Sequence, residues 1–325
     1  MESLFDFLPD TPLVSFTILI LVALFIPPIF EKLRLPGLVG LLVAGVLLGP
    51  HGLRFLNPED DTISLLSDAG KIYLMFVAGL EIDLNDFRKK KNRALAFGLA
   101  TFALPLTAGF LVGRAFGFDW NASVLIGSLL ASHTLLGYPI VNRLGVVKNE
   151  AVTVTIGATI FTDIAALLVL AICVSIHAGE FTLPSLLIRL SSLALYAAVV
   201  LLGIDWAGKE YFRRTGDEES NQFLFVLAAV FLASVGAQSI DIEKIVGAFL
   251  AGLAINDVIG NGPVKEKVKF VGSTLFIPFF FVGMGLLLDL PKFAQTLTST
   301  AGLGLTVAIV GGLIGSKFLA TLIPK

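Results

Sequence analysis

The sequence has little charge and few residues that bind metals or form disulfides. Only 15% of its 325 residues are Asp, Glu, Lys or Arg, whereas a typical soluble domain carries about 25%. One cysteine and three histidines supply neither a disulfide framework nor a Cys/His zinc motif. A net charge of −2 gives no electrostatic basis for nucleic-acid binding. With 56% hydrophobic residues and a mean hydropathy of +0.90, the composition indicates an integral membrane protein.

The apolar runs predict an all-α polytopic domain over residues 1–325, because a membrane helix needs about 20 mostly apolar residues. Two of the predicted spans are short and carry small residues four positions apart, Gly45/Gly49 and Ala248/Gly252. Such steps let helices approach closely, so both spans are expected to pack inside the bundle. About eleven spans are predicted, at residues 12–30, 36–50, 63–86, 94–116, 121–142, 151–177, 184–207, 222–240, 245–259, 269–290 and 299–323.

The basic residues predict the orientation, since cytoplasmic loops carry an excess of Lys and Arg. Fifteen of the 23 basic residues follow odd-numbered spans and four follow even-numbered spans. This asymmetry places the N-terminus outside and the odd-numbered exits in the cytoplasm. The lipid bilayer is the expected surrounding partner.

The central residue of the sixth predicted span is an aspartate, Asp163, preceded by Thr162. An ionisable group at mid-depth costs at least about 2.5–3.5 kcal/mol and points to a functional site. No Lys or Arg lies within fourteen residues of Asp163 in the sequence. Pairing with a distant cation, which would only stabilise the bundle, is the alternative interpretation.

The fifth predicted span contains a polar and irregular segment at the same expected depth. Ser132, His133 and Thr134 stand near its middle, and Pro139 removes a helix hydrogen bond. Broken helix is tolerated at membrane depth only where it is buried or lines a cavity. Free carbonyls, hydroxyls and one carboxylate would form an oxygen site for Na⁺ or another small cation. The candidate ligands are Asp163, Thr162, Ser132, Thr134 and His133. The alternative for this span is an ordinary proline kink, with His133 packed against a neighbouring helix.

Other charges in the spans have structural interpretations. Asp68 and Lys71 lie three residues apart and are expected to pair, and Glu81 is expected to be solvated. Lys317, near the cytoplasmic end of the last span, is expected to extend its ammonium group to the surface. The span at 269–290 has no Lys or Arg after Gly272, so no cationic partner for Asp163 is expected there.

Four ordered motifs resemble the bacterial monovalent cation:proton antiporters that include the NapA-type and Kef-type sodium or potassium exchangers. The resemblance extends over the whole chain. The motifs are LPGLVGLLVAGVLLGP (residues 35–50), LMFVAGLEID (residues 74–83), GAFLAG (residues 247–252) and FFFVGMG (residues 279–285).

This resemblance implies an inverted-repeat fold with a dimerisation domain and a core domain, in which two broken helices cross beside a carboxylate on the sixth helix. Asp163 falls on that carboxylate, and Ser132–Thr134 fall on the first broken helix. Relatives often have a second polar or acidic residue where this chain has Thr162. They also have twelve or thirteen spans, so the family's last helices and any soluble C-terminal domain are expected outside this chain. The family generally forms homodimers.

The expected activity is therefore transport rather than enzymatic catalysis, and it needs no cofactor. Asp163 would hold either a proton or a monovalent cation, Na⁺ or K⁺, during alternating access. One carboxylate and no paired lysine predict an electroneutral exchange. Two other functions fit the residues: a cation-coupled symporter of a small anion or solute, and a membrane sensor that does not transport.

Overall fold

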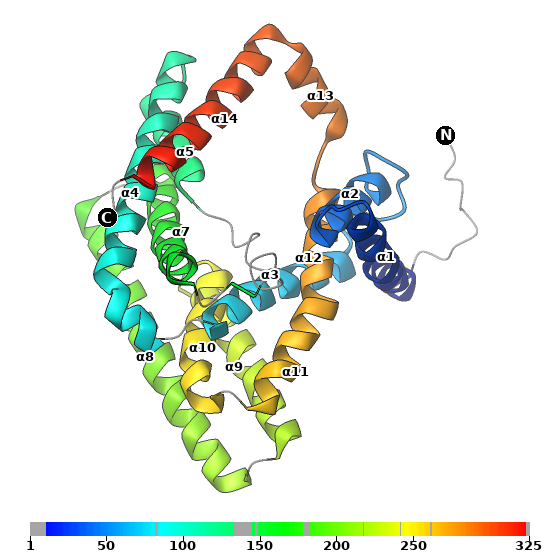
Figure 1. The fold of residues 1–325 in the computed structure, drawn as a ribbon, viewed down its shortest axis with the longest axis vertical. Helices are drawn as coiled ribbons and strands as arrows, with labels where there is room; N and C mark the ends of the chain where they lie inside the picture. The colour runs from blue at the N-terminus through cyan, green and yellow to red at the C-terminus, as the bar shows by residue number, and fades with distance from the viewer. Residues whose placement is uncertain are drawn as a thin grey trace. The chain divides into compact units, whose positions relative to one another are not determined.

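The computed structural model describes residues 11–81, 84–132, 145–146, 149–177, 182–216, 218–240, 242–260 and 262–322. These residues form helices and no strand (Figure 1). Within them, seven helices are long and apolar enough to cross a membrane. The chain divides into two compact units.

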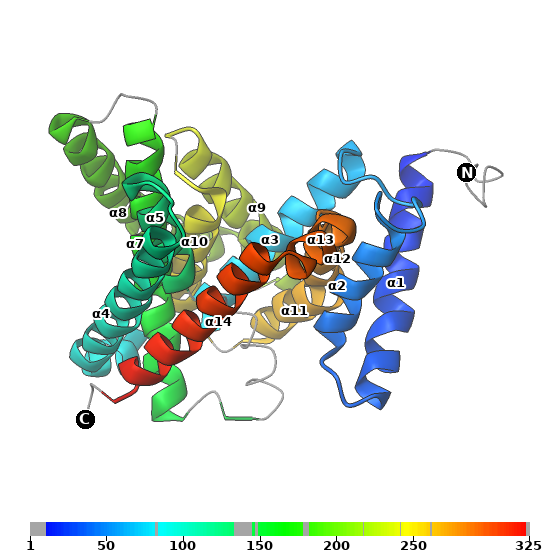
Figure 2. The ribbon, with the colours of Figure 1, turned by 90° about the horizontal axis from the view of Figure 1, so that it is seen from above.

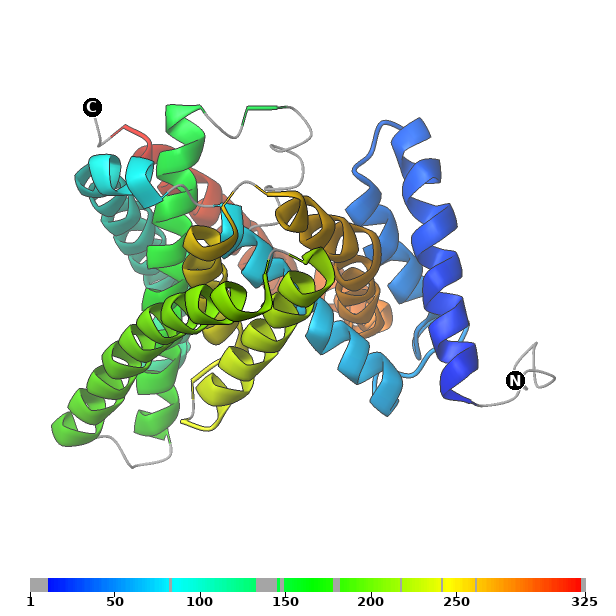
Figure 3. The same cartoon turned by 90° about the horizontal axis from the view of Figure 1, so that it is seen from below.

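The first unit comprises residues 1–81 and 196–294. Its centre is α3, against which α10 and α12 pack, and α1 lies beside α2 (Figures 2 and 3). The side chains of Tyr73, Phe76 and Phe279 are fully buried in this core. The unit contains α1 (Pro12–Lys32), α2 (Gly37–Leu48), α3 (Asp61–Glu81), the end of α8 (Leu183–Thr215), α9 (Glu219–Gln238), α10 (Lys244–Ile259), α11 (Pro263–Val271), the π-helix η2 (Gly272–Phe276) and α12 (Ile277–Leu286).

Glycines make the close helix crossings of this unit, as predicted for its two short spans. A Cβ atom on Gly45 of α2 would lie 2.1 Å from the carbonyl oxygen of Val282 on α12. A Cβ atom on Gly252 of α10 would lie 2.3 Å from the carbonyl oxygen of Phe76 on α3. Both distances are far below van der Waals contact, so only glycine fits at these two crossings.

The predicted span at 269–290 is an α-helix interrupted by a π-helical turn. The turn, η2, lies directly before α12, whose first turn contains Pro278. Tyr73 stacks on Phe276 at a ring-centroid distance of 4.9 Å and donates a hydrogen bond to the carbonyl oxygen of Val268, at 3.1 Å. This one side chain therefore supports the helix on both sides of the point where the α-helical hydrogen-bond pattern changes.

The second unit comprises residues 82–195 and 295–325. Its helices are α4 (Leu84–Ala115), α5 (Trp120–Ala131), α7 (Glu150–His177), the start of α8 and α14 (Thr300–Ala320). Helix α4 packs against α5, α7 and α14. Gly109 of α4 and Gly127 of α5 face each other, since a Cβ atom on Gly109 would lie 2.6 Å from the Cα atom of Gly127. The remaining helix, α13 (Leu290–Thr298), contains the division between the units.

Ion pairs at the ends of α3 correct one expectation and confirm another. Glu81 is not solvated: it pairs with Lys269 of α11, and its side chain is only 15% exposed. The expected pair of Asp68 and Lys71 is present at 3.5 Å, and Lys244 of α10 also binds Asp68, at 2.5 Å. These contacts tie α3 to α11 at one end and to α10 at the other.

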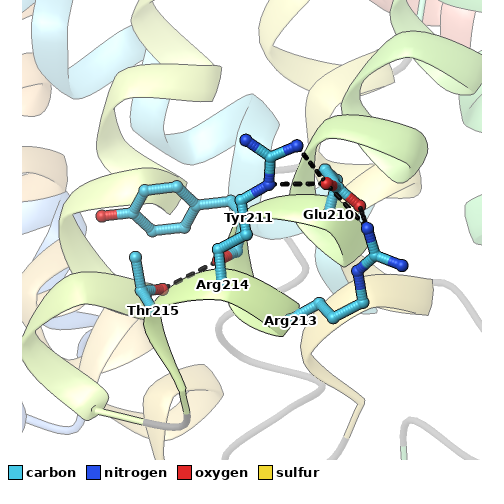
Figure 4. Close-up of polar contacts among 5 residues, drawn as sticks. All are labelled: Glu210, Tyr211, Arg213, Arg214 and Thr215. Carbon is cyan, nitrogen blue, oxygen red and sulfur yellow. Dashed lines mark hydrogen bonds and ion pairs between the residues drawn. The ribbon is translucent and has the colours of Figure 1, made fainter.

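The basic end of α8 is held by one carboxylate (Figure 4). Glu210 pairs with Arg213 and with Arg214, each at 2.6 Å, while both arginines stay largely exposed. The chain then leaves the helix at Gly216, whose φ of 75° is the left-handed conformation that glycine adopts readily. Cationic side chains here also oppose the negative end of the helix dipole.

Candidate functional site

Helix α5 ends inside the predicted fifth span. Its N-terminus is capped by Asp119, which accepts a hydrogen bond from the Ala122 N–H at 2.7 Å. The helix ends at Ala131, and Ser132 is extended with φ −63° and ψ 145°. Its twelve residues span about 18 Å, too short to cross the bilayer core. The helical path therefore stops at the predicted polar segment; His133 and Thr134 lie outside the described residues.

The candidate carboxylate belongs to an uninterrupted helix. Thr162 and Asp163 stand at the middle of α7, a 28-residue helix. The Thr162 side chain is fully buried, and its hydroxyl donates to the carbonyl oxygen of Thr159 at 2.9 Å. The side chain of Asp163 lies outside what the structure describes.

A hydrogen bond between α5 and α7 sets the relative depth of their residues. The side-chain amide of Asn121 donates to the carbonyl oxygen of Cys173 at 2.8 Å. Consecutive spans run in opposite directions, and each helix rises about 1.5 Å per residue. A residue a given number of positions after Asn121 therefore lies at the same depth as the residue that many positions before Cys173. Ser132 lies eleven residues after Asn121, and Thr162 lies eleven residues before Cys173. This register puts Ser132 level with Thr162 and its neighbour Asp163.

Lys317 of α14 contacts the C-terminal end of α5. Its Nζ atom donates to the carbonyl oxygen of Ala131 at 3.2 Å, a contact within the second unit. The last carbonyls of a helix lack helical partners and carry a partial negative charge, which an ammonium group satisfies. The expectation that Lys317 extends to the membrane surface is therefore wrong.

A signal for Lys317 was present in the sequence. No Asp or Glu follows Asp289, so Lys317 stands in an apolar span without an acidic neighbour. An intramembrane lysine of this kind requires a partner on another helix. The sequence does not indicate which helix supplies that partner, because Ala131 lies 186 residues away in the chain.

A family model described as "Sodium/hydrogen exchanger, transmembrane" matches residues 19–324. The chain belongs to the sodium/hydrogen exchanger family. This confirms the resemblance carried by the four motifs. The match includes α5, α7 and Lys317.

Individual relatives agree with this family. The chain is 66% identical over 325 residues to the Na⁺/H⁺ antiporter NhaS5 of Synechocystis sp., a match that covers all of this chain and 46% of that protein. It is 30% identical over 298 residues to a Na⁺/H⁺ antiporter of Enterococcus hirae, covering 89% of this chain and 77% of that protein. The chain thus spans less than half the length of NhaS5.

A solved structure has the same fold. The sodium/proton antiporter MjNhaP1 of Methanocaldococcus jannaschii, determined at pH 8, superposes with a TM-score of 0.69. The alignment covers 95% of this chain and 81% of that one, at 16% sequence identity. The all-helical antiporter architecture predicted from the motifs is thereby confirmed.

Proposed function

We propose that this chain forms the membrane domain of an antiporter that exchanges a monovalent cation, Na⁺ or K⁺, for protons. The observation that carries the proposal is the register of α5 and α7. In this register the C-terminal end of α5 and the neighbouring Ser132 lie at the same depth as Thr162 and Asp163. Oxygen ligands around one carboxylate suit a small hard cation. The names of the Synechocystis and Enterococcus relatives favour Na⁺.

Competition at Asp163 couples the two fluxes in this proposal. The ionised carboxylate without a cation is costly inside the bilayer, so the site crosses the membrane carrying either a proton or a cation. Binding of the cation releases the proton on one side, and the reverse happens on the other side after alternating access. Thr162, Ser132, Thr134 and His133 complete the proposed cation site.

Reconstitution of the full-length protein in proteoliposomes tests this assignment. Adding Na⁺ or K⁺ outside should move protons, as reported by a pH-sensitive dye, and Asp163→Asn should abolish that movement. Asp289→Asn, a change outside the spans, is the matched control and should leave it intact. Undiminished exchange in a monodisperse Asp163→Asn preparation would remove Asp163 from the mechanism.

We also propose that one cation exchanges for one proton, with Lys317 protonated throughout the cycle. Its ammonium group is held by the Ala131 carbonyl, so Asp163 is the only group that changes its proton in this scheme. The exchange rate should then be independent of an imposed membrane potential. If the rate depends on the membrane potential, and Lys317→Met removes that dependence, then Lys317 also releases a proton during the cycle.

The proposed setting is a homodimer in a bacterial inner membrane with the N-terminus outside. The exposed basic end of α8, Arg213 and Arg214, then faces the cytoplasm. Reporter fusions active only on one side of the membrane, placed after Gly216 and after Asp289, should give opposite results. Size-exclusion chromatography with light scattering measures the oligomeric state.

A further inference from the structure

Helix α13 is a short helix between two membrane spans. The span formed by α11, η2 and α12 ends at Leu286, and the span formed by α14 begins at Thr300. Helix α13 occupies the interval as Leu290–Thr298. Nine residues extend about 13 Å, less than half the thickness of the hydrocarbon core. The covalent connections on both sides therefore hold this helix at a surface of the bilayer.

The residues of α13 segregate into an apolar face and a polar face. At 100° per residue, Leu290, Phe293, Ala294 and Leu297 fall within an arc of about 100°, and Lys292, Gln295 and Thr296 lie on the other side. On the polar face, the side chain of Lys292 is 83% exposed and pairs with Asp289 at 3.1 Å. This pattern is typical of helices that lie in the plane of a membrane interface.

The apolar face of α13 has no protein cover within the described structure. Phe293 is 59% exposed and Leu290 is 46% exposed, and no residue of the helix is buried. The exposed apolar surface continues along the chain on both sides, to Leu287 at 72% and Leu303 at 48%. Leu303 belongs to α14, a span whose outer side chains face lipid. The apolar face of α13 is thus continuous along the chain with the lipid-facing surface.

We propose that α13 lies in the membrane interface with Leu290, Phe293, Ala294 and Leu297 inserted at the boundary between headgroups and acyl chains. In this proposal the lipids of the bilayer cover the apolar face of α13. Because the division between the two units falls between Ala294 and Gln295, the chain passes from one unit to the other within a membrane-anchored helix. This inference depends on the membrane spans and is independent of the transported ion.

Spin labels at single cysteines test the proposal in liposomes of the full-length protein. Cys173 is first replaced by serine, and labels are then placed at residue 293 or, as a matched control, at residue 295, with transport confirming that each variant is folded. The label at 293 should be accessible to oxygen and protected from a water-soluble nickel chelate, and the label at 295 should show the reverse. Equal nickel access at both positions would place the helix in water. Protection of 293 from both reagents would show a protein partner, such as a second copy, and would equally overturn the proposal.

Discussion

The Nζ atom of Lys317 on α14 lies 3.2 Å from the carbonyl oxygen of Ala131, the last residue of α5. This contact joins α14, the last described helix of the chain, to the C-terminal end of the short helix α5 at the candidate site. It supplies a positive charge at a helix end where partial negative charge gathers. A cation contributed by the protein itself therefore lies next to the proposed binding region of a transported cation.

Replacing Lys317 by methionine, which keeps the length and removes the charge, should destabilise the second unit and slow transport. A hydrogen bond from a charged donor contributes about 1.5–3 kcal/mol, so the thermal unfolding midpoint in detergent should fall. Lys317→Arg should recover part of the stability because it keeps the charge. Lys292→Met, at an exposed lysine, is the control; equal midpoints for the two methionine variants would refute the structural role.

The crossing of α2 and α12 predicts a strong effect of a single methyl group. Gly45→Ala would place Cβ 2.1 Å from the Val282 carbonyl oxygen, so the helices must move apart, at a cost of about 1–3 kcal/mol or more. Gly203→Ala in α8 meets nothing within 4 Å and should be neutral or slightly stabilising. Thermal unfolding of the two variants in parallel gives the comparison. A Gly45→Ala protein as stable as Gly203→Ala would mean that the crossing is looser than the structure shows.

Two neighbouring threonines of α7 separate cation coordination from helix packing. Thr162→Val should raise the apparent KM for Na⁺ about tenfold, equal to about 1.4 kcal/mol of binding, through the loss of one oxygen ligand. Thr159→Val is the matched control, because Thr159 is also buried and its hydroxyl makes the same kind of backbone hydrogen bond, to Thr155 at 2.8 Å. A similar change in both variants, measured as Na⁺-dependent proton movement, would assign the effect to packing.

The N-cap of α13 should depend on pH. The pKa of Asp289 lies below the ordinary 3.8, chiefly because its carboxylate accepts the Lys292 N–H, with Lys292 and His51 adding favourable charge. A lowered pKa means that this contribution is complete above the ordinary pKa and is lost as the pH falls through the lowered value. A spin label at residue 293 should therefore become more mobile only below about pH 4. Asp289→Asn cannot titrate and should show no such transition; a transition in both proteins would have another origin.

Much of this protein could be predicted from its sequence because membrane insertion acts on each segment by itself. A run of apolar residues predicts a helix wherever its neighbours pack, and each of the eleven predicted ranges contains helix in the described structure. The glycine steps at Gly45 and Gly252 likewise predicted close crossings, since the absence of a side chain is a local property. Thr162 and Asp163 stood out because a polar pair at mid-span is costly in any arrangement.

Only the tertiary structure decided where the long charged side chains end. Lys317 and Glu81 each had a solvent-exposed alternative that the sequence made plausible, and each instead meets a partner on a helix distant in the chain. The depth of Ser132 relative to Thr162 also required the hydrogen bond between Asn121 and Cys173. These features depend on which helices are neighbours, and that choice reflects the packing of whole helix surfaces rather than any local run of residues.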